Sequence, residues 1–322
     1  MAIDRDEVAE RYPWLMPHTG SLNVMMGDDL DAVLSAVLFL HLHPQARLIG
    51  VYHRYREIIC GPGLRWDEIC SSVWLDLDIY HSACRSLGHH IVRISPYDRL
   101  LGFHNSCNIN LLIDRDYRDF KHKYPLGTIH FLMYLYGVEI PSSNNADLLI
   151  WLADSAYING QSHRYPWNVR EWIQQHIPVC SLQACLNQID TLEFENRMAD
   201  FCRILESKGF QRGREQVQSR YKRLGGYQCQ PRGEVGPYIQ SILGFVSELT
   251  GWQLHPYQVA NVDQWATRYM GNRSTARLDE VKICGLDCFL RNREVFSFAI
   301  PSRTTLNYTN RINDQPRSHL DV

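Results

Sequence analysis

The strongest constraint on the fold is a stretch near the N-terminus in which a strand, an acidic turn and a helix follow one another directly. Residues 21–26 (SLNVMM) are apolar enough to predict a buried strand, and the turn GDDLD follows at once. Residues 32–43 (AVLSAVLFLHLH) predict a buried helix that stops at Pro44, and residues 46–53 (ARLIGVYH) predict a second strand. Strands that alternate with helices indicate a parallel sheet.

This alternation continues to about residue 165. Two further strands are predicted, over residues 72–79 (SVWLDLDI) and 90–95 (HIVRIS). Three helices are predicted, over residues 66–70, 126–137 (ending at Gly137) and 147–157. We therefore expect residues 1–165 to form an α/β domain whose parallel sheet is covered by helices on both faces.

The second half of the chain has a different pattern. Residues 167–207 are predicted to be mostly helical, and residues 211–236 are polar, basic and Gly-rich, as in a linker. An amphipathic helix is predicted over residues 237–252, and a hairpin over residues 281–301 with its tight turn at Arg291-Asn292-Arg293. We expect residues 166–322 to form a helical connector and a smaller α+β domain that binds a substrate or a partner.

The composition is that of an ordinary globular protein. The chain has 322 residues, of which 45% are hydrophobic and 21% charged, enough for roughly two domains. The formal net charge of -2 gives no overall attraction to nucleic acid or to an anionic membrane. Among the 33 basic residues 28 are Arg, whose fork-shaped guanidinium suits phosphate, although a lineage preference for Arg codons is the alternative explanation.

Targeting and redox signals are few. No apolar run approaches the ~20 residues of a membrane span, and the charged N-terminal segment lacks the apolar core of a signal peptide. The ten cysteines are scattered, without any C-x-x-C pair. We expect a cytoplasmic protein with reduced thiols and no association with membranes.

Two carboxylates follow the first predicted strand. Asp29 and Asp31 lie on the turn between this strand and the next helix, at the edge of a parallel sheet where ligands bind. Carboxylate oxygens in such a place suit Mg²⁺ or Mn²⁺. The alternative is that Asp29 caps the helix and Asp31 is an acidic residue of its first turn.

Two more carboxylates interrupt an apolar strand. Asp76 and Asp78 stand in the segment VWLDLDI, although Asp is depleted in strands and a buried unpaired carboxylate is costly. A metal ligand at the end of the strand would resolve the conflict. The alternative is an edge strand with these residues on its exposed face.

A histidine pair and one more acid complete the set. His89 and His90 follow Gly88 and could serve as a metal ligand and a phosphate contact, or form an ordinary surface turn. Asp154 stands alone in an apolar helix, where a local hydrogen bond could equally satisfy it.

The order of these motifs resembles the DHH phosphoesterase superfamily. That superfamily includes RecJ-type exonucleases, oligoribonucleases, cyclic-dinucleotide phosphodiesterases and family II pyrophosphatases. A further match lies between the histidines and Asp154, where Asn108-Ile109-Asn110 and then Lys123-Tyr124-Pro125-Leu126-Gly127-Thr128 resemble a RecJ-type stretch. The resemblance spans residues 21 to about 160, half of the chain, and implies a DHH-type parallel-sheet domain.

The resemblance implies a role for each matched residue. Asp29 would bind a first Mn²⁺ or Mg²⁺ ion and Asp31 a second, with Asp76 bridging them, or Asp78 in its place. His89 and Asp154 would complete the second site, and His90 would contact the scissile phosphate. The remaining matched residues, expected to bind substrate, are Asn108 and Asn110.

Two positions depart from the family pattern. Met25 stands where the family usually has a His ligand, four residues before the first Asp, and a thioether is a poor ligand for hard cations. Gly88 replaces the first Asp of the name motif, which in the family orients the following His. The second site keeps its full set of ligands. These departures are compatible with catalysis by one metal ion or with an inactive fold retained as a scaffold.

The C-terminal half lacks the Gly-Gly-Gly-His motif of the family's usual second domain. Arg273, Arg291 and Arg293 are the candidates for binding substrate phosphates in its place, helped by Arg277 and Arg303. The nearby aromatic residues Phe296, Phe298 and Tyr308 could stack on bases. The alternative is a solvated Arg surface over an aromatic core.

Together these features favour a metal-dependent phosphodiesterase that hydrolyses single-stranded DNA or RNA, or short oligonucleotides, as an exonuclease does. One alternative is a catalytically inactive DHH-like scaffold in a nucleic-acid or defence assembly, with a protein partner or as a homo-oligomer. Another is a phosphodiesterase of nucleotides or cyclic dinucleotides.

Overall fold

A computed structural model describes residues 1–17, 20–143, 145–156, 166–188, 191–212, 227–229, 235–259 and 261–312. The end of the helix predicted over residues 147–157, the domain boundary predicted at residue 165 and much of the linker predicted over residues 211–236 lie outside these residues.

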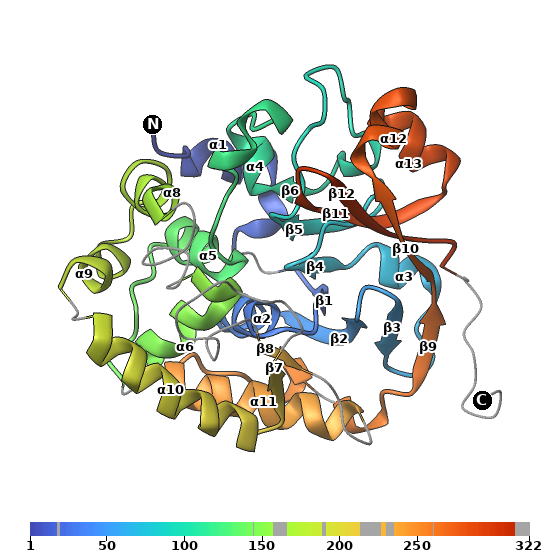
Figure 1. The fold of residues 1–322 in the computed structure, drawn as a ribbon. Helices are drawn as coiled ribbons and strands as arrows, with labels where there is room; N and C mark the ends of the chain where they lie inside the picture. The colour runs from blue at the N-terminus through green and yellow to red at the C-terminus, as the bar shows by residue number, and fades with distance from the viewer. Residues whose placement is uncertain are drawn as a thin grey trace.

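A seven-stranded, mostly parallel sheet organises the molecule (Figure 1). Its strand order is β6-β5-β4-β1-β2-β3-β9. The strands are β1 (Leu22–Met26), β2 (Ala46–His53), β3 (Glu57–Cys60), β4 (Val73–Leu75), β5 (Arg85–Gly88), β6 (Cys107–Asn108) and β9 (Thr267–Met270). Strands β1, β2, β4, β5 and β6 run parallel, whereas β3 is antiparallel to both β2 and β9. The α/β class and the mostly parallel sheet are thereby confirmed.

Alternating side chains of the strands build two different cores. Val24 and Met26 of β1 belong to the cluster that includes the helices α2 (Leu30–Leu42), α5 (Thr128–Tyr136), α6 (Ala146–Leu152) and α11 (Val235–Thr250). Met25 faces the other way, into a cluster with Trp74 of β4, α3 (Trp66–Cys70) and β11 (Val295–Ser302). The sheet is therefore covered on both faces, which explains why its strands are apolar at nearly every position.

Further helices extend the first of these cores. They are α1 (Arg5–Arg11), α4 (Ile109–Leu112), α8 (Pro166–Glu171), α9 (Cys180–Gln188) and α10 (Thr191–Ser207), with a π-helical turn at Trp172–His176. Short 3₁₀ helices occur at Pro13–Leu15, Leu101–Phe103, Tyr117–His122, Ala153–Ser155, Pro256–Val259 and Val262–Gln264. Among the described residues, one hydrophobic cluster runs from Ile3 to Trp265.

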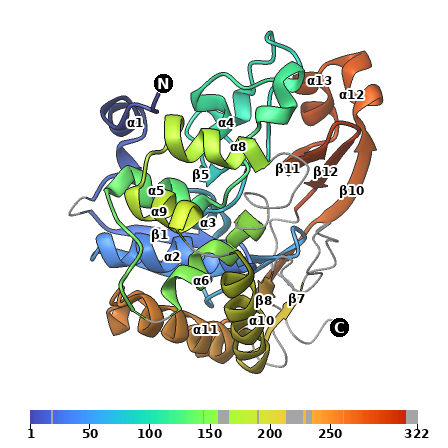
Figure 2. The same ribbon diagram turned by 60° about the vertical axis from the view of Figure 1, so that its left-hand side comes forward.

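The C-terminal segment forms a second, three-stranded antiparallel sheet in the order β10-β12-β11. Its elements are β10 (Asn272–Arg277), α12 (Leu278–Cys284), α13 (Leu286–Asn292), β11 and β12 (Thr305–Asn310). Figures 1 and 2 both show α12 and α13 at the opposite end of the molecule from α10 and α11. A separate two-stranded sheet pairs β7 (Phe210–Arg212) with β8 (Tyr227–Cys229) in antiparallel orientation.

Several predicted elements are confirmed and others are wrong. Strand β2 and helix α3 have the predicted bounds, and α5 ends at Gly137, whose φ of 67° suits a glycine C-cap. The hairpin predicted over residues 281–301 is wrong, because Leu286, Phe289 and Leu290 have helical spacing and pack in the C-terminal core as part of α13. The strand predicted over residues 90–95 is also wrong, since its apolar residues are buried under the C-terminal sheet instead.

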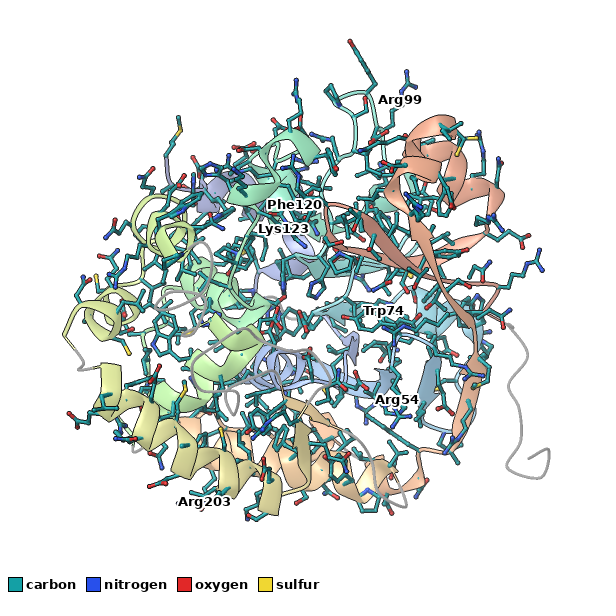
Figure 3. All side chains as sticks on the ribbon, viewed as in Figure 1. Arg54, Trp74, Arg99, Phe120, Lys123 and Arg203 are labelled. Carbon is teal, nitrogen blue, oxygen red and sulfur yellow. The ribbon has the colours of Figure 1, made fainter. Side chains whose placement is uncertain are left out.

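The C-terminal sheet is attached to the carboxyl edge of the central sheet through β11. The amide of Phe298 donates to the carbonyl of Asp78 (3.3 Å), and the amide of Ile300 donates to the carbonyl of His90 (2.8 Å). The Lys123 ammonium donates to the carbonyls of both His90 and Ile300, at 3.1 Å each. In Figure 3, Lys123 accordingly lies beside the end of β11. These bonds place the C-terminal sheet next to the predicted site.

Within the part of the chain that the structure describes, no helix is both long and apolar enough to cross a membrane.

The packing of α11 predicts opposite effects for two Gly→Ala changes in one helix. A Cβ at Gly236 would lie 1.5 Å from the carbonyl oxygen of Val262, whereas a Cβ at Gly244 would meet nothing within 4 Å. We expect Gly236→Ala to lower the free energy of unfolding by about 1–3 kcal/mol, and Gly244→Ala to raise it by up to about 1 kcal/mol through helix propensity. Urea unfolding measures both, and equal effects of the two changes would contradict the packing.

Candidate metal centre at the carboxyl edge of the sheet

The predicted acids and histidines come from four separate segments that meet at one edge of the sheet. Asp29 caps α2 through a hydrogen bond from the amide of Ala32 (2.9 Å), and Asp31 lies in the first turn of the same helix. The other three segments contribute Asp76 directly after β4, His89 and His90 directly after β5, and Asp154 in the 3₁₀ turn Ala153–Ser155 that follows α6. Strand β4 ends at Leu75, so the acids of VWLDLDI lie beyond the strand and not within it.

Asp31 is held by the N-terminus of α5. Its carboxylate oxygens accept hydrogen bonds from the amides of Thr128 (2.6 Å) and Ile129 (2.9 Å). Gly127 makes this approach possible, because a Cβ at that position would lie 2.6 Å from a carboxylate oxygen of Asp31. Amides at a helix N-terminus stabilise a negative charge, so the carboxylate of Asp31 is fixed in place although it is almost fully buried.

Thr128 also connects Asp76 with His89. Its hydroxyl donates to Oδ1 of Asp76 (2.8 Å) and lies 3.0 Å from Nδ1 of His89. Because this hydroxyl has one hydrogen and Asp76 takes it, Nδ1 of His89 must donate to the hydroxyl oxygen. In the neutral ring Nε2 then carries a free lone pair, and it faces Oδ2 of Asp154 at 2.7 Å. Two acceptors so close together require a proton or a cation between them.

Two groups of side chains that share His89 could each ligate a cation. Ligand atoms of Asp31, His89 and Asp154 all lie within 4.8 Å of one another, and so do those of Asp76, His89 and His90. The five residues are buried or nearly so, with the side chain of Asp154 the most exposed at 28%. Carboxylate oxygens with one or two imidazole nitrogens form a donor set suited to a divalent metal ion.

The electrostatics of the centre favour a bound cation. Burial, and then the charges of neighbouring carboxylates, raise the pKa of Asp29 and of Asp76 well above the usual value, and raise the pKa of Asp31 to about 6. Burial would also raise the pKa of Asp154, but the hydrogen bond and the charge of His89 lower it to about 2. A cation among these groups would relieve the repulsion that the raised pKa values report.

Two of the candidate ligands have a backbone conformation that residues other than glycine rarely adopt. The φ angle is 59° at Asp76 and 48° at Asp154, in the left-handed region. Such a conformation costs on the order of 1 kcal/mol or more at a residue other than Gly and is concentrated at functional sites. Both residues turn their carboxylates toward His89.

Asp78 holds the backbone of the histidine turn and belongs to neither group of potential ligands. Its carboxylate accepts hydrogen bonds from the amide of His90 (2.8 Å) and from the side chain of Asn108 (2.6 Å). A Cβ at Gly88 would lie 2.7 Å from the carboxyl carbon of Asp78, so this carboxylate fills the space that a side chain at position 88 would need. Of the two acids predicted as alternative metal ligands, Asp76 belongs to a group of potential ligands and Asp78 does not.

The predicted substrate contacts Asn108 and Asn110 are buried within the protein. Asn108 accepts from the amide of Asn110 (3.0 Å) in addition to its bond with Asp78. The side chain of Asn110 donates to the carbonyls of His89 (2.7 Å) and Ile91 (3.0 Å) and accepts from the amide of Tyr124 (2.7 Å). Their side-chain amides are engaged by the chain itself and position the histidine turn.

A pocket adjoins the centre at His90. Its lining includes His90, Arg273, Tyr55, Phe298, Asn307 and Tyr308. The guanidinium of Arg273 lies 5.9 Å from the centre of the Tyr55 ring, and no carboxylate in the described part of the chain forms an ion pair with it. Nε2 of His90 is buried without a hydrogen-bond partner among the described residues, 4.0 Å from Asp76. The pocket therefore joins the candidate ligands to an Arg and to aromatic rings.

The other predicted Arg residues lie elsewhere. Arg291 and Arg293 are exposed at the end of α13, and neither is among the residues that line this pocket. Met25 is completely buried in the apolar cluster with Trp74 and Tyr52, on the far face of the sheet from α2. The position expected to hold a His ligand of the first metal site thus contributes to the core.

Sequence reasoning missed Thr128, Gly127 and Tyr55 as members of the site. Thr128 and Gly127 belong to the stretch Tyr124-Pro125-Leu126-Gly127-Thr128, and a Gly directly before a helix was a usable signal for a close approach. Tyr55 lies between β2 and β3 with no motif around it. Only its place in the fold reveals it.

The chain was compared with known families, proteins and structures. No protein-family model, no curated protein and no solved structure matches the chain.

The raised pKa of Asp31 predicts how the binding of a divalent cation depends on pH. Below about pH 6 Asp31 holds a proton that the cation must displace, so the affinity should rise about tenfold per pH unit up to that point and more slowly above it. Isothermal titration of Mn²⁺ into the protein at several pH values and constant ionic strength measures this. An affinity that is constant across the pH range would contradict a role of Asp31 as ligand.

Proposed function

We propose that the protein is a metal-dependent phosphodiesterase with a single catalytic metal ion, acting on single-stranded or short oligonucleotides. The observation that carries this proposal is that two groups of potential ligands sharing His89, one with Asp31 and Asp154 and one with Asp76 and His90, lie beside a pocket that contains an Arg. The order of these residues along the chain resembles the DHH phosphoesterases, and the mostly parallel sheet with its site at the carboxyl edge is compatible with that family.

The residues present fit one Mn²⁺ or Mg²⁺ ion better than two. The group of Asp31, Asp154 and His89 offers two carboxylates and one imidazole, so oxygen donors dominate, as these ions prefer. A first site of the family type would need a His at position 25, where Met25 lies in the apolar core. The carboxylate of Asp29 is already engaged as the cap of α2 and belongs to neither group of potential ligands among the described residues.

The chain provides the groups that a phosphodiester hydrolysis requires. The chemistry that such a metal ion supplies is activation of a coordinated water and withdrawal of charge from a phosphoryl oxygen. Thr128 keeps the proton of His89 on Nδ1, which directs the lone pair of Nε2 toward the metal position. Asp29 interacts electrostatically with Asp31 and Asp154, and its raised pKa suits it to accept a proton from the attacking water.

His90 is proposed to contact the substrate phosphate. Burial, and then the charge of His89, lower the pKa of His90 well below its usual value, so the ring is neutral at neutral pH. Its Nε2 has no hydrogen-bond partner among the described residues, and the ring lines the pocket with its side chain 22% exposed. The carbonyl of His90 accepts hydrogen bonds from Lys123 and from the amide of Ile300, which hold its backbone in place.

The pocket suits a nucleotide better than an inorganic phosphate compound. Arg273 offers a charged fork for a phosphate, and the rings of Tyr55, Phe298 and Tyr308 offer faces or edges for a base. The three-stranded C-terminal sheet supplies Arg273 from β10, Phe298 from β11 and Tyr308 from β12. Recognition of the substrate is thus assigned to this sheet, with Arg273 as the phosphate contact.

Metal binding and hydrolysis should be lost together when a ligand is changed. We expect Asp31→Asn and Asp154→Asn to weaken Mn²⁺ binding by at least about tenfold and to lower kcat on a short single-stranded oligonucleotide by about 10²–10³-fold. Asp200→Asn, an exposed acid of α10, is the matched control and should change neither. Titration calorimetry and a gel assay with Mn²⁺ measure the two effects.

Each outcome of this test is informative. If the wild-type protein binds Mn²⁺ but cleaves only cyclic dinucleotides or mononucleotide substrates, then these compounds and not oligonucleotides are its substrates. Protein that binds no Mn²⁺ and hydrolyses none of these would overturn the proposal and favour the inactive scaffold. Full activity in both ligand variants would exclude the mechanism.

Arg273 should affect substrate binding more than turnover. Because it reaches the pocket but belongs to neither ligand group, we expect Arg273→Ala to raise KM about tenfold or more and to leave Mn²⁺ affinity unchanged. Arg291→Ala, an exposed Arg of α13, is the control and should behave as wild type. Steady-state kinetics distinguishes the two, and equal effects of both changes would contradict the placement of the substrate.

A further inference from the structure

A second group of potential metal ligands lies at the opposite end of the same strands. Cys70 is the last residue of α3, and Cys84 directly precedes β5. His81 lies between them in the chain, in the connection from β4 to β5. This group is near the amino ends of β4 and β5, whereas Asp76 and His89 follow their carboxyl ends.

The three side chains face one another closely. The two sulfur atoms and one ring nitrogen all lie within 4.8 Å of one another. Zinc bonds of about 2.3 Å to sulfur and about 2.0 Å to nitrogen place tetrahedral ligands roughly 3.5 to 4 Å apart, so small side-chain movements are enough to bind the ion. The turn itself places His81, because its carbonyl accepts from the amide of Cys84 (2.9 Å).

Burial makes this group unusual for thiols. Cys70 is 3% exposed and Cys84 is fully buried, while His81 is half-buried. Burial, and then the neighbouring Cys70 thiol, raise the pKa of Cys84 strongly. A Zn²⁺ ion bound by both sulfurs as thiolates forms a complex without net charge, since two thiolates balance the ion and the imidazole is neutral. A neutral complex is the form that a buried position accommodates at least cost.

The connection between β4 and β5 supplies a structural reason for such an ion. Residues 76–84, all of which the structure describes, contain no helix, although the two strands are parallel neighbours. Parallel strands are usually joined by a crossover of about a dozen residues or more with a helix. A metal that ties His81 and Cys84 to the end of α3 would hold this short crossover in place.

We propose that Cys70, His81 and Cys84 form a zinc site separate from the carboxylate centre, with the fourth position open to water beside the half-buried His81. Its two thiolates select a soft or borderline ion such as Zn²⁺, whereas the carboxylate centre selects Mn²⁺ or Mg²⁺. The zinc site anchors the crossover that carries Asp76 and Asp78 to the strand that carries His89.

Cobalt substitution and metal analysis test this site in the full-length protein. Protein purified under reducing conditions without chelator should contain about one zinc per chain, and Co²⁺ exchanged into it should give the intense near-ultraviolet absorption of a cobalt–thiolate bond. We expect Cys84→Ser and His81→Ala to lose the zinc. Cys84→Ser should weaken this absorption strongly, and His81→Ala should alter the cobalt spectrum.

Two controls separate this site from other sources of metal. Cys107→Ser removes a buried thiol of β6 that belongs to none of the ligand groups and should keep both zinc and the cobalt–thiolate absorption. Asp154→Asn disables the carboxylate centre and should also keep them, because that centre contains no sulfur. His81→Ala replaces only a half-buried ring, so it keeps the test decisive if Cys84→Ser does not fold.

Three results would overturn the proposal. The first is reduced wild-type protein that neither contains zinc nor gives a cobalt–thiolate absorption. The second is an absorption that persists unchanged in Cys84→Ser and His81→Ala. The third is a Cys70–Cys84 disulfide, found by mass spectrometry of freshly isolated protein, which would show that the two thiols form a covalent bond instead of binding an ion.

Discussion

Repulsion among buried carboxylates at the carboxyl edge of the sheet is the constraint on which the rest of the structure depends. Asp31 and Asp76 are almost fully buried close to Asp154 and His89, and no one interaction compensates all of them. The chain stabilises each acid separately: the N-terminus of α5 holds Asp31, Thr128 holds Asp76, and His89 faces Asp154. A bound cation would complete the compensation, and the left-handed backbone at Asp76 and Asp154 accompanies carboxylates that both lie close to His89.

The surrounding parts of the molecule keep this arrangement rigid. Asp78 accepts hydrogen bonds from the amide of His90 and from Asn108, and the amide of Ile300 in β11 donates to the carbonyl of His90. The C-terminal sheet is therefore placed by the site itself, and it adds the pocket with Arg273. The pocket is lined by Tyr55 and His90 and by residues of the C-terminal sheet, which packs in a core of its own.

Much of the fold and of the site could be predicted because the signals were local. Strand β2, helix α3 and the end of α5 at Gly137 follow from periodicity and a glycine cap. The candidate ligands were found because acids after buried strands are unusual. The functions expected of Asn108 and Asn110 could not be judged in this way, since their hydrogen bonds join residues far apart in the chain. Likewise, the apolar residues of 281–301 are compatible with the spacing of a strand and with that of a helix. Residues 286–292 form the helix α13 because Leu286, Phe289 and Leu290 pack in the C-terminal core.

The sequence by itself determined the α/β class, the parallel pairing of the first strands and the identity of the acids and histidines at their ends, because these depend on neighbours along the chain. Tertiary structure alone decided that Asp76 and not Asp78 joins a group of potential ligands, that Met25 belongs to the core, and that Arg273 and not Arg291 reaches the pocket. It also brought Cys70, His81 and Cys84 together, although their spacing matches no metal motif. The physical reason is that ligation and repulsion fall off within a few ångströms, and distances of that size are set by how distant segments pack.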